Sequence, residues 1–380
     1  MTTLSLSDEL RLAVVSDIHL GHRRNKTEDI IKNLMAAFPD NAETARLDII
    51  FLAGDVYDDL LSLPSDDATE IEIWFGIFLR VCKKHQIMVR ILEGTPGHDW
   101  KQSKRFLAIN DIAEIGADLK YVKDLSIEYI EQYGITVLYV PDEWELKTEK
   151  TLSQVHELLR AKGLDQVDYA IMHGQFEYQL PAHVKAPVHN SAEYLKIVRE
   201  LIFIGHVHIH TRLDRIIAQG SFDRLSHGEE GPKGHVRAVV RANGERDIVF
   251  VENEGAKLFV TVQCLGMDLD QTIEQVHRKV GGLPPGSFTR LEGNEDNPVF
   301  SAMEQIVRLY PLFTWSKLVR ENDAAVEDLY TEDNTDMFVP ITLSRDNLNT
   351  ILMERLTSTG ISGLVFVASE EILKECMSDV

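Results

Sequence analysis

The sequence predicts an α/β protein in which a layered sheet domain is followed by a smaller α+β module. Two observations predict it. Short β-branched or apolar runs alternate with longer amphipathic stretches through the first 210 residues, and a second, shorter set of such runs begins after residue 254. The length of 380 residues favours two domains, or one large domain with an appendage. We expect a first domain over 1–253, a small α+β domain over 254–320, and an acidic linker with a C-terminal helical tail over 321–380.

Six strand-like runs organise the first domain. In chain order they are RLAVVSD, DIIFLAGD, IMVRILEG, ITVLYVPD, DYAIMHG and LIFIGHVH. Helical patterns lie between them near 27–38, 68–86, 101–115 and 147–163. All but one of the strand-like runs end directly in a His or Asp cluster. Ligand sites in open α/β sheets form at the carboxyl ends of the strands, so this placement predicts a site there.

The pattern changes after residue 210. TRLDRIIAQGS and HVRAVVRANGERDIVFVEN read as β runs, and Asn243-Gly244 is a good hairpin signal. In the second module we expect strands in AKLFVTVQCLG and SFTRLEG, and helices in DLDQTIEQVHRKV and NPVFSAMEQIVRLY. The stretch 321–336 carries seven acidic residues and no Lys or Arg, which predicts an exposed linker before two closing helices.

Composition narrows the class of protein. A net charge of −22, from 39 basic and 61 acidic side chains, argues against a broad electrostatic grip on nucleic acid. Cys82, Cys264 and Cys376 lie far apart without a CxxC pair, so we expect three reduced thiols. No stretch approaches the roughly 18 uncharged apolar residues of a membrane helix, and MTTLSLSDELRL lacks the layout of a signal peptide. We therefore expect a cytoplasmic protein that does not engage a membrane.

Five segments carry the chemistry, because each places metal-type ligands directly after an apolar strand. They are Ser16-Asp17-Ile18-His19, Gly54-Asp55, Gly97-His98-Asp99, Met172-His173-Gly174 and Gly205-His206-Val207-His208. Singly, each is a weak signal, since a lone His after a strand is more often a turn or core residue. Five in order on one sheet edge predict a metal centre.

The ligand mix predicts which ions bind. Carboxylates together with imidazoles suit manganese, iron or zinc better than an all-oxygen calcium or magnesium site. The Asp17-x-His19 and His206-x-His208 pairs need an extended or looped backbone, in which alternate residues can face one point. Two ions about 3.5–4 Å apart would clamp a phosphate and generate a nucleophile from water.

The order DxH, GD, GxHD, H, GHxH resembles the calcineurin-like metallophosphoesterase superfamily. The segments SDIHLGH, GDVYDD and GSFDRLSHGEEGPKGHVRAVV are similar to its DNA-repair nuclease branch, the SbcD or Mre-eleven type. The motifs cover residues 11–240. The resemblance implies a metallophosphoesterase β-sandwich flanked by helices, with the α+β module in the place of that family's capping domain.

The resemblance also implies roles for single residues. Asp17, His19 and His208 would hold the first ion, His173 and His206 the second, and Asp55 would bridge both. His98 would stand over the phosphate, with Asp99 beside it in the catalytic box. We expect substrate contacts from His22, Arg23, Arg24 and Arg224, although basic spots of this kind are equally typical of solvated helix starts.

One departure from the family concerns the second ion. The family box is Gly-Asn-His-Asp or Glu, with the Asn as a ligand, whereas this chain has Gly94-Thr95-Pro96-Gly97-His98-Asp99. With Gly97 read in the Asn position, the ligand is missing. A water, a backbone carbonyl or the Thr95 hydroxyl would then replace it, or the second ion would bind more weakly.

These inferences predict a DNA nuclease subunit, an exonuclease and perhaps endonuclease, that uses two divalent ions, manganese first and iron, zinc or magnesium as alternatives. No GxxxxGK[ST] loop is present, so ATP hydrolysis would come from an SbcC-like coiled-coil ATPase partner. We also expect a homodimer that forms through Ile71, Trp74, Phe75, Phe78 and the 101–115 stretch, although side chains in such a pattern are equally typical of packing on the sheet. The alternatives are a small-molecule phosphodiesterase or phosphatase of the same superfamily, and a non-catalytic scaffold.

Overall fold

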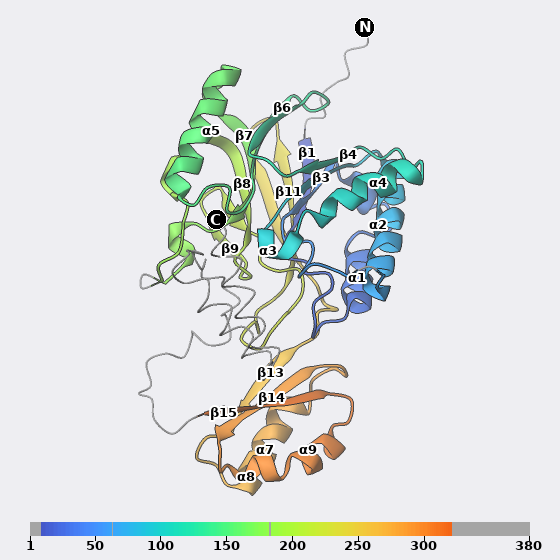
Figure 1. Cartoon of the computed structure of the whole chain (residues 1–380), viewed down its shortest axis with the longest axis vertical. Helices are drawn as coiled ribbons and strands as arrows, with labels where there is room; N and C mark the ends of the chain where they lie inside the picture. The colour runs from blue at the N-terminus through green and yellow to red at the C-terminus, as the bar shows by residue number, and fades with distance from the viewer. Residues whose placement is uncertain (1–8, 63, 182–183, 321–380) are drawn as a thin grey trace, which may run out of the picture. The chain divides into compact units, whose positions relative to one another are not determined.

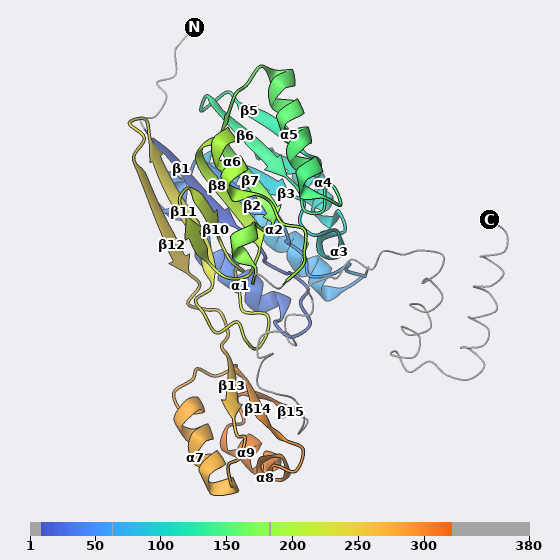
Figure 2. The same cartoon turned by 90° about the vertical axis from the view of Figure 1, so that its left-hand side faces the viewer.

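The structure is a computed structural model that describes residues 9–62, 64–181 and 184–320. The expected acidic linker, the helical tail and Cys376 lie outside the described residues. Within the described ranges the chain forms two six-stranded sheets and one three-stranded sheet. Figures 1 and 2 show the two larger sheets face to face, with helices along their outer surfaces.

The first sheet has the strand order β12-β11-β1-β2-β3-β4. Strands β1 to β4 run parallel, whereas β11 pairs antiparallel with β1 and β12 antiparallel with β11. The bounds are β1 Glu9–Val15, β2 Ile49–Ala53, β3 Met88–Leu92, β4 Leu119–Val122, β11 Gly234–Arg241 and β12 Arg246–Glu252.

The second sheet has the order β5-β6-β7-β8-β10-β9. Strands β6, β7, β8 and β10 are parallel, and the two outer strands β5 and β9 are antiparallel to their neighbours. The bounds are β5 Ser126–Ile130, β6 Ile135–Val140, β7 Val167–Gly174, β8 Val198–His206, β9 Thr211–Leu213 and β10 Ile216–Ala218.

Three apolar clusters fill the interfaces between the layers. One lies between the first sheet and helices α1 (Thr27–Ala37), α2 (Asp66–His85) and α4 (Arg105–Ile112). A second fills the space between the two sheets. The third packs α5 (Thr148–Lys162) and α6 (Ser191–Ile197) on the second sheet. The result is a helix–sheet–sheet–helix sandwich, and this confirms the predicted fold class.

The central strands are apolar on both faces because both faces are covered. In β2, Ile50 and Leu52 face the helices, while Ile49, Phe51 and Ala53 face the other sheet. Successive side chains of a strand point to opposite faces, so a strand buried on both sides reads as one continuous apolar run. This is why the sequence shows these strands clearly.

The smaller module is a parallel three-stranded sheet in the order β13-β14-β15. Its core is formed by a separate apolar cluster that includes Val262, Leu291 and Ile306. The bounds are β13 Phe259–Gln263, α7 Leu269–Val280, β14 Phe288–Asn294, α8 Pro298–Ser301, α9 Met303–Leu309 and β15 Thr314–Arg320. The helix expected in NPVFSAMEQIVRLY is thus split at Ala302, where the backbone leaves helical geometry (φ −93°, ψ 6°).

The part of the expected homodimer contact that lies on α2 is corrected by the packing of that helix. Ile71, Trp74, Phe75 and Phe78 are all buried against the first sheet, so they are not available to a second copy. Cys82 and Cys264 are free thiols, both buried. None of the described helices is long and apolar enough to cross a membrane.

Candidate metal centre

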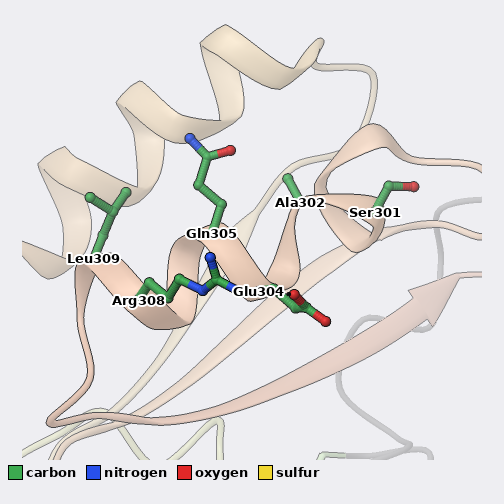
Figure 3. Close-up of a pocket in the computed structure, with 6 residues that line it drawn as sticks. All are labelled: Ser301, Ala302, Glu304, Gln305, Arg308 and Leu309. Atoms are coloured by element: carbon green, nitrogen blue, oxygen red, sulfur yellow. Dashed lines mark ion pairs between the residues drawn. The ribbon is translucent and has the colours of Figure 1, made fainter.

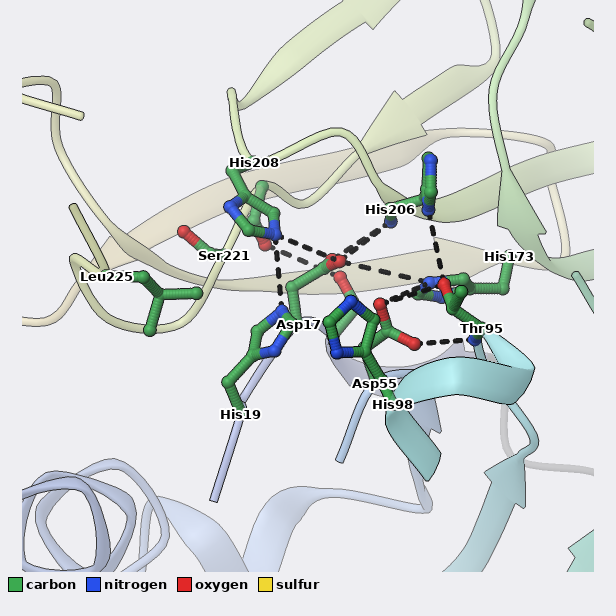
Figure 4. A network of polar contacts seen from close by, with 12 residues as sticks. Asp17, His19, Asp55, Thr95, His98, His173, His206, His208, Ser221 and Leu225 are labelled. Atoms are coloured by element: carbon green, nitrogen blue, oxygen red, sulfur yellow. Dashed lines mark hydrogen bonds and ion pairs between the residues drawn. The ribbon is translucent and has the colours of Figure 1, made fainter. Parts of the chain in front are cut away.

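Parallel strands from both sheets deliver the candidate ligands to one edge. Asp17 and His19 follow β1, Asp55 follows β2, and His98 lies on the short helix α3 (Pro96–Asp99) after β3. From the second sheet, His173 lies near the end of β7, His206 ends β8, and His208 follows it. Figure 4 shows these side chains converging on one point. The structure therefore brings all six predicted metal ligands together.

Four of these residues adopt the left-handed backbone region. Their φ angles are 51° at Asp17, 54° at His19, 49° at Asp55 and 102° at His206. Positive φ is strained for residues other than glycine, and such strain collects at functional sites, where the surrounding structure enforces it. The strand ends therefore turn abruptly, and the turn aims the side chain at the site.

The first group comprises Asp17, His19 and His208. The Nε2 atoms of the two imidazoles lie 3.2 Å apart, and Asp17 Oδ1 lies 3.7 Å from His208 Nε2. Ligand atoms that share one ion about 2.1 Å away have separations of this size. The group therefore has the dimensions of a divalent-ion site.

Two carboxylates orient the imidazoles of the first group. His19 Nδ1 donates to Asp58 Oδ1 and His208 Nδ1 donates to Glu229 Oε1, both at 3.1 Å. In both rings the proton is then on Nδ1. The lone pair on Nε2 of His19 therefore faces the lone pair on Nε2 of His208. Metal-binding histidines usually donate their other ring N–H to a carboxylate, as these two do. A cation between the two Nε2 atoms would remove the repulsion between their lone pairs. Lys233 in turn pairs with Glu229 at 2.7 Å.

The second group comprises Asp55, His173 and His206. His173 Nδ1 donates to the carbonyl of Ala53 at 2.7 Å, which directs Nε2 toward Asp55 Oδ2 at 3.1 Å and Asp17 Oδ1 at 4.0 Å. The ring is completely buried, yet Nε2 has no hydrogen-bond partner among the described residues. A buried nitrogen without a partner is costly in free energy, and a bound ion would satisfy it. The donors present therefore fit a divalent metal ion.

Electrostatics couple the two groups. Burial alone would raise the pKa of Asp55, but the imidazoles of His173, His19 and His98 outweigh it and hold that pKa well below the usual carboxyl range. Burial alone would lower the pKa of His173, but the Asp55 and Asp17 carboxylates raise it well above its usual value. Positive charge is therefore favoured beside these carboxylates, and a metal ion would compete with a proton for the same place.

Thr95, and not Gly97, is the residue of the Gly94–Asp99 box that reaches the second group. Its Oγ1 lies 3.1 Å from Asp55 Oδ2 and 3.4 Å from His206 Nδ1, and its N–H donates to Asp55 Oδ1 at 2.6 Å. A Cβ at Gly97 would meet nothing within 4 Å. Of the alternatives left open by the sequence, the geometry favours the Thr95 hydroxyl.

His98 stands beside the first group. Its Nδ1 donates to the carbonyl of Asp58, and its ring packs edge-on against His19 with centroids 4.9 Å apart. This leaves Nε2 as the nitrogen with a free lone pair. His98 also forms a third Asp/His group with His19 and Asp58, but it shares none with Asp17 or Asp55.

Asp99 has a different place from the one expected. It is fully buried and accepts the N–H groups of Asp55, Tyr57 and Gly94 at 3.1, 3.0 and 2.7 Å. Burial, with the charges of Asp55 and Glu93, raises its pKa to about 7. Its carboxylate binds the loops that carry Asp55 and Thr95, so the structure makes it a positioning residue rather than a group that touches reacting atoms.

The expected substrate contacts divide into two classes. Arg23 and Arg24 are exposed. His22 Nδ1 accepts the N–H groups of Arg24 and Asn25 at 3.3 and 3.1 Å, and its burial lowers its pKa, so it stabilises the turn before α1. Arg224 is only 6% exposed and donates to the carbonyl of Ala256 at 3.0 Å, which corrects its expected role in substrate binding.

Sequence reasoning missed the residues that support the ligands. Asp58, Glu229 and Lys233 lie in segments quoted for the family resemblance, but only the orientation of His19 and His208 identifies their roles. Asp142 was also missed, although it ends the strand-like run ITVLYVPD. It lies 3.5 Å from His206 Nδ1 and 3.1 Å from Thr95 Oγ1.

A separate hollow lies in the smaller module. It has a volume of about 470 Å³ and is lined by residues of α8 and α9 and the link between them (Figure 3). Its charged members, Glu304 and Arg308, are exposed and pair with each other. It brings no carboxylate and imidazole together and does not suggest a catalytic site.

No protein-family model and no curated protein matches the sequence. Solved structures do match. One is 15% identical, and the match covers 64% of this chain and 100% of that chain, with a TM-score of 0.36. Another, the crystal structure of TT1561 of Thermus thermophilus, is 11% identical, with coverages of 63% and 98% and a TM-score of 0.38. At these identities no activity transfers to this chain, and its function has to follow from its own residues.

Proposed function

We propose that this chain is a two-metal-ion phosphoesterase that hydrolyses phosphodiester bonds of DNA, with manganese as the leading candidate for both ions. One observation carries the proposal. The two Asp/His groups are adjacent, because Asp17 Oδ1 lies 3.7 Å from His208 of the first group and 4.0 Å from His173 of the second. Two ions held there would polarise a phosphate and activate a water as nucleophile.

The chain's own residues provide the rest of the reaction. Asp58 and Glu229 fix the tautomers of His19 and His208, and the carbonyl of Ala53 fixes that of His173. His98, with Nδ1 bound to a carbonyl, can stabilise the phosphate or pass a proton to the leaving oxygen through Nε2. Asp99 ties together the loops on which Asp55 and Thr95 lie.

Support for DNA as the substrate comes from the SDIHLGH and GDVYDD segments and from the extra module after residue 254. The exposed Arg23 and Arg24 would contact the phosphate backbone. The same resemblance supports an SbcC-like ATPase as the partner, and ATP hydrolysis would come from that partner, since the sequence has no GxxxxGK[ST] loop.

The test compares two substrates under one set of conditions. Linear duplex DNA and bis-p-nitrophenyl phosphate are incubated with the full chain in manganese or in excess chelator. His173→Ala removes a buried ligand, and His156→Ala, at an exposed position of α5, is the matched control. We expect cleavage of both substrates with manganese, none with chelator, and loss in His173→Ala only.

Other outcomes select the alternatives. Cleavage of the small diester without cleavage of DNA would indicate a small-molecule phosphodiesterase. Manganese binding without any hydrolysis would indicate a scaffold. Activity that survives in His173→Ala would reject the site itself.

A further inference from the structure

The loop between β6 and α5 places an additional carboxylate beside the second Asp/His group. Asp142 Oδ2 lies 3.1 Å from Thr95 Oγ1 and 3.5 Å from His206 Nδ1. Its side chain is 13% exposed, so water screens it only slightly. The family resemblance assigns no ligand to this strand end.

The Thr95 hydroxyl cannot donate a hydrogen bond to both neighbouring carboxylates. The Thr95 hydroxyl lies 3.1 Å from Asp55 Oδ2 and 3.1 Å from Asp142 Oδ2, but it has one proton to donate. If Asp55 accepts it, Asp142 Oδ2 faces the hydroxyl's lone pairs and has no other donor nearer than His206 Nδ1; if Asp142 accepts it, Asp55 Oδ2 depends on His173 Nε2 at 3.1 Å. The contact at 3.5 Å from His206 Nδ1 is too long for a strong hydrogen bond. Buried charges of this kind are paired or coordinate a metal ion.

A second, independent observation points to the same place. His173 Nε2 is buried and has no hydrogen-bond partner among the described residues, and it faces Asp55 Oδ2 at 3.1 Å. Asp55 thus lies between His173 Nε2, which makes no hydrogen bond among the described residues, on one side and the Thr95–Asp142 pair on the other. A cation among these atoms would satisfy both.

The position of Asp142 is also fixed by its surroundings. Its Oδ1 accepts the N–H of Glu143 at 2.9 Å. A Cβ at Gly174, the residue after His173, would come within 3.1 Å of the same oxygen. The absence of a side chain at Gly174 therefore lets the carboxylate approach the end of β7.

We propose that Asp142 is a metal-binding residue of the second group, where it adds a carboxylate to Asp55, His173, His206 and Thr95. The proposal rests on the two-metal function proposed above. Its consequence is that the second group has no missing donor. Two carboxylates and a hydroxyl give it more oxygen ligands than the first group, and this composition favours harder ions such as manganese or magnesium over zinc.

The experiment measures metal binding and needs no substrate. Manganese is titrated calorimetrically into the metal-free full chain of the wild type, Asp142→Asn and Glu143→Gln. The Asn variant keeps the size of the side chain and removes its charge. Glu143 is the matched control, because it is the next residue in the same loop and its carboxylate makes no hydrogen bond or ion pair with the second group among the described residues.

We expect two sites in the wild type, an affinity at least about tenfold lower at one site in Asp142→Asn, and wild-type binding in Glu143→Gln. Thr95→Val should show the same one-site loss and Thr95→Ser should restore binding, so a second pair of variants tests the cluster should Asp142→Asn fail to fold.

Two results would overturn the inference and leave the proposed function intact. One is wild-type affinity at both sites in a folded Asp142→Asn. The other is an equal loss in Glu143→Gln, which would mean that the charge of the loop matters and the position does not. A wild type that binds no manganese at all would overturn the two-metal function together with this inference.

Discussion

His98 and His173 show how differently two histidines can serve one site. His173 is buried, and its Nε2 faces the carboxylates of both groups. His98 is partly exposed, is held through Nδ1 by the carbonyl of Asp58, and faces the first group from the side. Removing each imidazole should therefore have a different effect.

We predict that His98→Ala lowers turnover by about 10² to 10⁴, the usual contribution of a positioned acid or base, while manganese content stays at the wild-type level. Turnover is measured with bis-p-nitrophenyl phosphate and metal content by elemental analysis of the same sample. His173→Ala serves as the reference for metal loss. A His98→Ala protein that loses an ion would mean that His98 is a ligand.

At the residue scale, the sequence predicts the candidate metal-binding residues and not the residues that orient them. Asp17 and Asp55 follow an apolar strand and His206 ends one, so position in the chain indicates their candidate role. Asp58 and Glu229 carry no such signal, because their importance depends on which nitrogen of an imidazole faces the site. The same limit explains Gly97, since counting along the chain could not show that Thr95 is the residue that reaches Asp55.

At the scale of elements, every described strand with two neighbours lies in a predicted run, whereas only half of the edge strands do. Strands β4, β5 and β15 were missed, and each lies at the edge of its sheet. An edge strand pairs on one side only and tolerates polar side chains, so it lacks a continuous apolar run. The short helix α6, with seven residues, was missed as well. It has too few turns to show a helical period.

The loop after β3 gives an element-scale prediction. A Cβ at Gly94 would lie 2.1 Å from the backbone nitrogen of Asp55 and 2.2 Å from its Oδ1. Gly94→Ala should therefore displace Asp55, cause loss of metal, and lower the free energy of unfolding by about 1–3 kcal/mol through overpacking.

Gly97→Ala is the control, because its Cβ would enter open space three residues further along the chain, in α3. Metal content and the free energy of unfolding, from chemical denaturation, are measured for both variants and compared with the wild type. Equal metal content and equal stability of the two variants would show that the close approach of Gly94 to Asp55 does not affect metal binding.

At the scale of the whole molecule, the three apolar layers make stability sensitive to acid through buried histidines. His235 on β11 is 1% exposed, packs against Phe38, and accepts a hydrogen bond from Arg237 Nε at 3.2 Å. Burial, and then the charge of Arg237, lower its pKa to about 3 from an ordinary value of 6.5. The unfolded chain therefore binds a proton at pH 5 that the folded chain does not.

Stability should fall as the pH drops from 6.5 toward 3, and His235 should account for about 2 kcal/mol of the loss by pH 5. His235→Gln keeps a hydrogen-bond acceptor and removes the titration, so its free energy of unfolding should fall less between pH 7 and pH 5. His156→Gln, at the exposed position on α5, should follow the wild type. Urea denaturation at the two pH values measures the difference, and parallel losses in all three proteins would exclude His235 as the cause.

The return of the chain from β8 to β11 has a consequence for synthesis on the ribosome. Val236 of β11 pairs with Val14 of β1, and the two ion-binding groups draw His173, His206 and His208 from the second sheet. A nascent chain that has emerged only through its first 160 residues or so lacks a ligand in each group and one neighbour of its first strand. The two Asp/His groups would therefore be completed only late in translation.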